Sequence, residues 1–194
     1  MPKLGMEPIR RAALVEATIA EIGVQGTLDV TVSQIARRAG MSSALAHHYF
    51  GGKEQIFLAA MRHVLAVYGA EVRGALAMAD GPRARLIAVI RAGFNSSNFR
   101  PEVIAAWLNF YALARTSPEA GRLLAVYKGR LAANLVHDLR PLVGEAAPGI
   151  AERLGGLIDG LYLREGLRQG APDGAGATAH VLRILDLEIK GALA

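Results

Sequence analysis

The chain has 194 residues, of which 52% are hydrophobic and 20% charged, with a formal net charge of +5 and no cysteine. This length suffices for a full core and two subdomains, and the lack of cysteine excludes disulfides, cysteine-based zinc sites and a cysteine nucleophile. No secretory signal or bilayer-spanning apolar run is present, so we expect a soluble, cytoplasmic protein.

The first predicted element is an amphipathic helix that ends near residues 23–26. Its apolar residues recur at helical spacing, at positions Ala12, Val15, Ile19 and Ile22. A second, short helix follows, and Thr31 with Gln34 fits a capping box at its start. Gly40 is suited to the positive φ that ends such a helix, and Ser42 is a good N-cap for the next one.

The third predicted helix has one apolar and one polar side. Residues that share the apolar side at i,i+4 spacing are Leu45, Ala46, Tyr49 and Phe50. Those on the opposite side are Ser43, Ala44, His47 and His48. In a helix-turn-helix the second helix enters the major groove, where Ser and His can bond base edges and Ala can meet a thymine methyl.

This pair of short helices therefore predicts a DNA-binding unit, with Tyr49 and Lys53 suited to phosphate contacts that set register. The predicted DNA-contacting residues are Thr31, Arg38, Ser42, Ser43, Ala44, His47, His48, Tyr49 and Lys53. Helix pairs with a glycine turn also occur in all-α proteins that bind no DNA. The combination of the capping box, the small Ala36, the turn and the trailing Tyr-Phe-x-x-Lys favours DNA binding.

Six further helices are predicted, and prolines 82, 101, 118 and 148 stand at helix starts, where a missing N–H is tolerated. Their expected ranges are 53–79, 83–99, 101–116, 118–143, 149–169 and 174–193. No segment shows the sustained alternation of a strand. We expect an all-α protein of about nine helices, with a helix-turn-helix domain at 1–52 and a helical ligand-binding and dimerisation domain at 53–194.

The positive charge is not concentrated in the predicted DNA-binding domain. Residues 1–60 hold six Lys or Arg and five Asp or Glu, whereas residues 61–140 hold eleven and five. Since net charge bears on association and not on fold, the helix-turn-helix pattern carries the prediction of DNA binding.

The helix-turn-helix segment resembles the tetracycline-repressor-type (TetR) family of transcription regulators. The matching residues are Ile35-Ala36, Gly40, Tyr49-Phe50 and Lys53. Two positions depart from the family pattern, since His47 stands where Tyr is usual and Ala46 where Leu is usual. The departures leave the DNA-binding role intact and put the exact base contacts in question.

Motifs beyond this segment resemble one subgroup of that family, the choline-responsive repressors of glycine betaine synthesis. They are Ile9-Arg10-Arg11, Trp107-Leu108-x-Phe110 and Leu157-Ile158-Asp159-Gly160-Leu161, and His48-Tyr49-Phe50 within the segment matches the same subgroup. The resemblance implies a homodimeric repressor of those genes whose binding to operator DNA is modulated by choline or a similar quaternary ammonium. Left open are a repressor that responds to another small hydrophobic or cationic ligand, and a ligand-binding protein without DNA function.

The last two predicted helices carry wide apolar faces. The residues expected in a dimer interface are Leu154, Leu157, Leu161, Val181 and Leu185, and Gly156-x-x-x-Gly160 would allow close approach of another helix. These side chains could equally complete the core of one subunit. The resemblance favours dimerisation, because the family pairs its last two helices in a four-helix bundle.

A quaternary ammonium donates no hydrogen bonds, so its site should use aromatic faces and a carboxylate. Five aromatic residues gather within eighteen positions: Phe94, Phe99, Trp107, Phe110 and Tyr111. The candidate ligand contacts are Asn95, Trp107, Phe110, Tyr111, Asp159 and Tyr162. An aromatic cluster at helical spacing is more often plain core, and only the resemblance favours a cage around Trp107.

Enzymatic function is not expected. The five histidines form no His-x-x-x-His pair, and no Gly-x-Ser-x-Gly or P-loop pattern occurs. We therefore expect no catalytic residues, no metal site and no cofactor.

Overall fold

The computed structural model describes residues 5–193, which form nine α-helices, one 3-10 turn and no strand. In chain order the helices are α1 (Met6–Gln25), α2 (Val32–Arg38), α3 (Ser43–Phe50), α4 (Lys53–Ala77), α5 (Gly81–Gly93), α6 (Pro101–Leu113), α7 (Pro118–Val143), α8 (Ala147–Gly166) and α9 (Gly174–Ala192), with η1 (Gly144–Ala146) before α8. The all-α prediction is confirmed.

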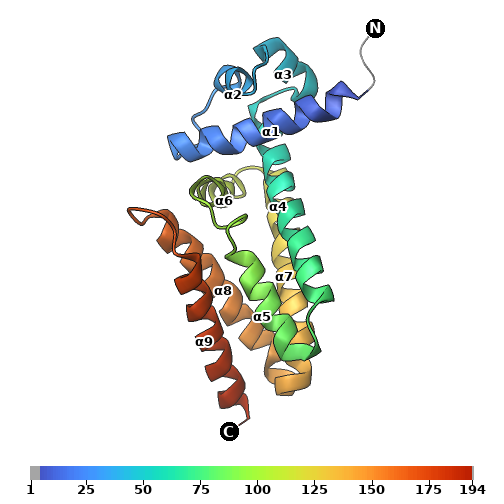
Figure 1. Ribbon diagram of the computed structural model, residues 1–194, viewed down its shortest axis with the longest axis vertical. Helices are drawn as coiled ribbons and strands as arrows, with labels where there is room; N and C mark the ends of the chain where they lie inside the picture. The colour runs from blue at the N-terminus through green and yellow to red at the C-terminus, as the bar shows by residue number, and fades with distance from the viewer. Residues whose placement is uncertain (1–4, 194) are drawn as a thin grey trace.

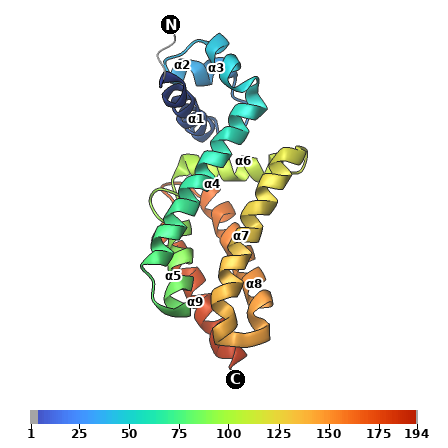
Figure 2. The ribbon, with the colours of Figure 1, turned by 90° about the vertical axis from the view of Figure 1, so that its right-hand side faces the viewer.

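The helices form a small head and an elongated body. Helices α1, α2 and α3 make the head at one end, and α4 runs from the head along the body (Figure 1). Helix α6 lies across the body directly beneath the head, and α7 runs alongside α4 (Figure 2). Helices α8 and α9 lie side by side at the far face of the body from α4. The chain thus places the helix-turn-helix pair at one tip of the molecule.

Most helix starts follow the caps and prolines of the sequence. Ser117 accepts a hydrogen bond from the N–H of Ala120 at the start of α7, and Asp173 caps α9 through Gly176. The helix predicted over 83–99 is wrong in its last part, because α5 ends at Gly93. The side-chain oxygen of Asn95 accepts bonds from the N–H groups of Ser97 and Asn98, so these residues fold into a turn.

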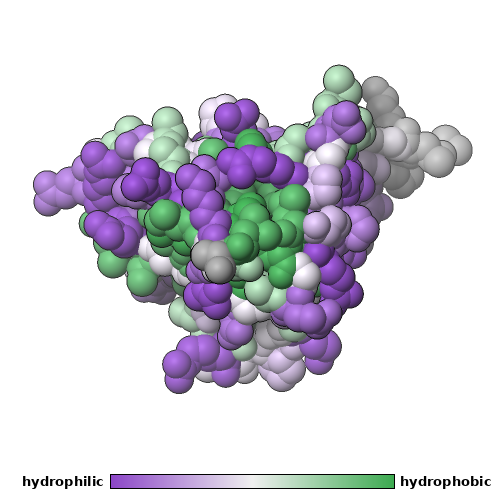
Figure 3. All heavy atoms as spheres, turned by 90° about the horizontal axis from the view of Figure 1, so that it is seen from below, coloured by the Kyte–Doolittle hydropathy of each residue, from purple (hydrophilic) through white to green (hydrophobic). Residues whose placement is uncertain are grey.

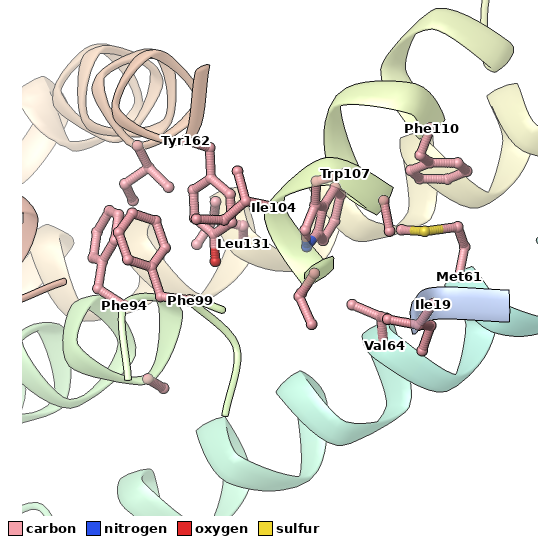
Figure 4. Close-up of a cluster of buried hydrophobic side chains, with 14 of the residues drawn as sticks. Ile19, Met61, Val64, Phe94, Phe99, Ile104, Trp107, Phe110, Leu131 and Tyr162 are labelled. Carbon is pink, nitrogen blue, oxygen red and sulfur yellow. The ribbon is translucent and has the colours of Figure 1, made fainter. Parts of the chain in front are cut away.

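The head is packed onto the body and not merely tethered by α4. A Cβ atom at Gly23 of α1 would lie 2.3 Å from Cβ of Glu102 in α6, so only glycine permits this approach. Asn109 of α6 donates a hydrogen bond of 3.1 Å to the carbonyl of Gly26. Phe110, which has no exposed surface, packs toward Ile19 of α1 and Met61 of α4 (Figure 4).

Candidate DNA-binding head and ligand site

The local geometry of the helix pair follows the sequence prediction. Both bonds of the capping box are present, since the Gln34 N–H donates to Thr31 Oγ1 at 3.2 Å and the Thr31 N–H donates to Gln34 Oε1 at 2.7 Å. Gly40 has a φ of 68°, and Ser42 Oγ accepts from the N–H of Leu45 at 3.2 Å. These caps fix where α2 ends and α3 begins.

The predicted DNA-reading side of α3 is exposed. Ala46, on the opposite side, has no exposed surface and packs into the head core with Ile35 and Ala36. Ala44, His47 and His48 are exposed, and Tyr49 is half-buried. A small residue at position 46 lets α3 approach α2 closely, and the polar side of α3 is left free to contact a groove.

Five of the predicted DNA contacts also bond within the head: Thr31 and Ser42 make the caps described above, and three others bond further residues. Ser43 Oγ donates to Ser33 Oγ at 3.0 Å, and His47 Nδ1 lies 3.0 Å from the Gly51 carbonyl. Arg38 Nε lies 2.5 Å from Glu21 Oε1. Ala44 and His48 make no such side-chain bonds within residues 5–193, so they are the best-placed candidates for base contacts.

Arg11 is a positioning residue that the sequence analysis missed. Its Nη1 donates a hydrogen bond of 2.6 Å to the Tyr49 carbonyl, and its guanidinium lies 4.4 Å from the centre of the Phe50 ring. A cation at the carboxyl end of a helix is favourable because it meets the negative end of the helix dipole. The sequence analysis named Arg11 only within the motif Ile9-Arg10-Arg11 and gave it no role, because Tyr49 lies 38 positions away.

The body contains a group of aromatic side chains contributed by four helices. Trp107 of α6 has its ring centre 5.7 Å from that of Tyr111, 4.7 Å from that of Tyr127 in α7 and 6.2 Å from that of Tyr162 in α8. Tyr68 of α4 lies 5.8 Å from Tyr127. We call Tyr68, Trp107, Tyr111, Tyr127 and Tyr162 the aromatic group.

The structure thus brings Trp107, Tyr111 and Tyr162 together as predicted and adds Tyr68 and Tyr127, which the sequence analysis did not select. Tyr68 lies on the apolar stripe of α4, and that stripe was the only signal for it. Tyr127 had none, because its neighbours come from other helices.

Asp159 supplies a carboxylate at the edge of the aromatic group. Its Oδ1 accepts a hydrogen bond of 2.9 Å from the Tyr111 hydroxyl, and its Oδ2 lies 3.4 Å from Nζ of Lys128. The same ammonium lies 5.7 Å from the centre of the Tyr111 ring. Burial, with the nearby Asp159 charge, raises the pKa of Tyr111, so this hydroxyl remains a donor at neutral pH.

Two further predicted ligand contacts pack against or bond other parts of the protein. Phe110 has its ring centre 5.8 Å from that of Trp107, and it also packs toward Met61 and Ile19 at the junction with the head (Figure 4). Asn95 is engaged in its own turn, and its amide donates a bond of 2.7 Å to Glu71. Both residues thus have structural contacts within the protein, and a contact of either with a ligand stays a prediction.

A cavity of about 650 Å³ lies between α4 and α7, beside the aromatic group. Tyr68 and Tyr127 line it and thus belong to both sites. Its remaining lining residues are apolar or small side chains, Asn134 and three arginines: Arg62, Arg73 and Arg130. Its volume falls within the usual range for small-molecule sites.

The structure divides the predicted dimer residues of α8 and α9. Leu154, Val181 and Leu185 have no exposed surface within the subunit. A side chain that is already fully covered has no area to bury against a partner, so the expectation is corrected for these three, which form core. Leu161 retains 8% exposure and Leu157 is half-buried.

Other apolar side chains are exposed instead, namely Leu163 of α8, Leu167 directly after α8 and Leu187 of α9. Apolar surface also gathers at the end of the body away from the head (Figure 3). A shallow groove between the start of α8 and the end of α9 is lined there by Ile150, Ile184 and Leu187, among others. No other atom of residues 5–193 lies within 4 Å of a Cβ built at Gly156 or Gly160, so these two glycines make no close contact with another helix of their own subunit.

Across residues 5–193, no set of three or more His, Cys, Asp or Glu side chains is placed to hold a metal ion. No helix within the same span is both long and apolar enough to cross a bilayer.

Comparison with known proteins assigns both parts of the chain. Residues 14–60 match the family model of the bacterial regulatory proteins of the tetR family, and residues 82–190 match that of the C-terminal domain of BetI-type transcriptional repressors. The HTH-type transcriptional regulator BetI of Brucella suis is 48% identical over 192 residues, covering 98% of this chain and 97% of its own. The regulator of that name in Agrobacterium fabrum is 47% identical over 191 residues, covering 98% and 93%.

Solved structures share the fold. A transcriptional regulator from Pseudomonas aeruginosa PAO1 is 31% identical with a TM-score of 0.78, covering 98% of this chain and 94% of its own. A regulator from Saccharomonospora viridis, solved in complex with choline, is 21% identical with a TM-score of 0.80 and covers 91% and 95%.

Proposed function

This chain belongs to the tetR family of bacterial regulatory proteins, and we propose that it works as a cytoplasmic homodimer that represses glycine betaine synthesis genes under the control of choline. Its C-terminal domain is of the BetI type, and the protein is a DNA-binding transcriptional repressor and not an enzyme. Residues 1–52 bind the operator, and residues 53–194 bind the effector and the partner subunit. A similar quaternary ammonium would serve in place of choline.

The observation that carries the DNA-binding part is the exposed side of α3. Ala44, His47 and His48 face away from the head, while Arg11 holds the carboxyl end of the helix in place. Two such heads related by a two-fold axis would read two half-sites of an operator. Homodimerisation through the exposed surface of α8 and α9 would supply that symmetry.

The choline part is supported by the aromatic group and Asp159. Ring faces attract a quaternary ammonium by roughly 0.5–2 kcal/mol each, more where water is excluded, and a carboxylate adds a charge of opposite sign. The choline complex of the Saccharomonospora viridis regulator shows that a protein of this fold can hold that ligand. The same aromatic surface also fits another small hydrophobic or cationic effector, which is the second candidate.

The DNA-binding proposal is tested by replacing His48 with Ala. Genomic fragments retained by the wild-type protein are first isolated, and affinity is then measured for the tightest fragment and for a random duplex. Loss of one base contact should remove about 1–3 kcal/mol of discrimination, roughly 5- to 150-fold, while binding to the random duplex persists. His180→Ala, an exposed histidine of α9, is the matched control.

Unchanged discrimination by His48→Ala would exclude this residue from base readout. Failure of the wild-type protein to retard any DNA at low salt would leave a ligand-binding protein without DNA function.

The choline proposal is tested by calorimetry with Asp159→Asn, which removes the charge and keeps the shape. We expect choline to bind the wild-type protein. Asp159→Asn should bind it about tenfold or more weakly, since one charge contact is worth up to a few kcal/mol near a protein surface. Asp186→Asn, at an acid of α9 that pairs with Arg83, should bind choline as the wild type does. No heat from the wild-type protein would discard choline and retain the repressor with another effector.

A further inference from the structure

We propose that the cavity between α4 and α7 is a binding site for an amphipathic organic anion, a carboxylate or phosphate head group on an apolar chain. The cavity lies where the two helices run side by side along the body (Figure 2). It is distinct from the edge of the aromatic group where Asp159 lies, and it does not depend on choline being the effector.

The walls of the cavity suit an apolar chain. Its aliphatic lining residues come from both helices: Leu65, Val72 and Leu76 of α4, and Leu123, Val126 and Leu131 of α7. Val72 and Leu131 are buried and form its deeper part. Apolar burial contributes roughly 25 cal/mol per Å², so these walls can bind the body of a ligand but give it no charge preference.

The charged side chains supply that preference. Arg62, Arg73 and Arg130 line the cavity, and no acidic residue does. Arg62 forms an ion pair with Glu119, whereas Arg73 and Arg130 have no acidic partner among residues 5–193. A guanidinium presents several donors in a planar fork that matches carboxylate and phosphate oxygens. Three such groups repel a quaternary ammonium and attract an anion.

Two tyrosine hydroxyls add neutral donors. Tyr111 and Tyr162 donate to protein acceptors, but the hydroxyls of Tyr68 and Tyr127 have no partner within the part of the chain that the structure describes, and both residues line the cavity. Burial raises the pKa of Tyr68 to about 12 and holds the pKa of Tyr127 well above its usual value. Both hydroxyls therefore keep their protons at neutral pH and can donate to an anionic ligand.

The site also accounts for a feature that DNA binding leaves unexplained. The basic excess of the chain lies in residues 61–140, outside the head, and all three cavity arginines belong to that segment. Gly69 contributes to their placement, because a Cβ there would lie 3.3 Å from Nη1 of Arg73. The guanidinium of Arg73 thus folds back against α4 at the cavity.

An occupant of this cavity would act on the start of α4, next to α3. Ser117, the cap of α7, donates a 2.6 Å hydrogen bond to Glu54 in the first turn of α4, and Arg62 pairs with Glu119 in the first turn of α7. An anion that binds Arg62 competes with Glu119 for this guanidinium. The ligand would therefore weaken one of the two polar links that join α7 to α4 near the head.

The test compares three probes of equal chain length on the full-length protein by calorimetry, each below its micelle concentration: decanoate, decyl phosphate and decyltrimethylammonium. We expect the anions to bind at least tenfold more tightly than the cation. Tighter binding of decyl phosphate would identify a phosphate head group, and tighter binding of decanoate a carboxylate. Equal binding of all three probes, or no binding of either anion, would overturn the proposal.

The matched variants locate the binding. Arg73→Gln with Arg130→Gln should lower anion affinity tenfold or more, while Arg122→Gln with Arg140→Gln removes the same charge from exposed positions of α7 outside the cavity and should not. Ala66→Trp, at an exposed position on the cavity, should block both anionic probes. Equal losses in the two double variants would show a non-specific charge effect and reject the site.

Choline titrations of the same variants separate this site from the proposed effector site. Retained choline binding with lost decanoate binding supports two sites. An absence of choline binding in every variant and in the wild type, with decanoate still bound, refutes the choline proposal alone.

Discussion

At the residue scale, a predicted contact is available only where the side chain is not already hydrogen-bonded within the protein. Ser43 and His47 lie on the exposed side of α3 as expected, yet each is already bonded to Ser33 or Gly51. His48 has no such bond within the described chain, so it is the better probe of base readout. Helical spacing gives the side of a helix on which a residue lies, but not the partner that a side chain finds.

Lys128 shows the same effect at the proposed choline site. Its ammonium lies 3.4 Å from Asp159 Oδ2 and 5.7 Å from the centre of the Tyr111 ring, which are the two kinds of contact that a quaternary ammonium requires. The protein thus carries its own cation at this carboxylate. A choline molecule at the same place must displace it.

We therefore expect Lys128→Gln to bind choline more tightly than the wild type. The gain should be roughly two- to fivefold, because an exposed ion pair contributes up to ~1 kcal/mol. Arg122→Gln removes the same charge from α7 at an exposed position and serves as the control. Calorimetry measures both. A weaker or unchanged choline affinity for Lys128→Gln, or an equal gain in the control, would show that Lys128 does not compete.

At the scale of helices, the contact of α1 with α6 decides how the head is mounted. Gly23 lies against the backbone of Glu102, Asn109 bonds the Gly26 carbonyl, and His63 Nε2 of α4 lies 2.9 Å from Glu16 Oε1 of α1. Helix α6 also carries Trp107 and Tyr111 of the aromatic group. One helix therefore contacts both the head and the proposed effector site, and so can couple them.

Gly23→Ala should disturb this contact. The added Cβ would lie 2.3 Å from Cβ and 2.8 Å from Cα of Glu102, so α1 must move away from α6. Overpacking of this kind costs about 1–3 kcal/mol. We expect that loss in urea unfolding, together with a smaller effect of choline on DNA affinity, which for coupled sites is typically ~1–3 kcal/mol.

Gly74→Ala in α4 is the control for this change. No atom lies within 4 Å of its Cβ position, so the alanine should leave stability unchanged or raise it by up to ~1 kcal/mol through helix propensity. If Gly23→Ala unfolds at the same urea concentration as Gly74→Ala, the close contact of α1 with α6 contributes little.

At the scale of the whole molecule, the proposed function requires two heads at a defined spacing. Three of the residues first expected between subunits, Leu154, Val181 and Leu185, form core, and the exposed surface carries Leu163, Leu167 and Leu187. Stable interfaces bury apolar side chains at their centre. The exposed side of α8 and α9 is thus the surface on which we expect the dimer to form.

Leu163→Arg with Leu187→Arg should convert the dimer to monomers in sedimentation equilibrium and sharply weaken operator binding, since one head reads only one half-site. Each side chain is about half exposed in the subunit, so the subunit itself should still fold. Met78→Arg places the same charge at an exposed apolar residue beyond the end of α4 and should leave the dimer intact. A double variant that remains dimeric would show that the interface lies on another surface.

The amino-acid sequence by itself determined the helix class, the capped helix pair, the Gly40 turn and the exposed side of α3, because caps, turns and helical periodicity act over a few neighbouring residues. Only the tertiary structure decided that Tyr68 and Tyr127 join Trp107, that Lys128 faces Asp159, that Arg11 holds α3 and that Leu154 is core. These contacts join residues far apart in the chain. They depend on how the helices pack against one another, which periodicity within one helix does not specify.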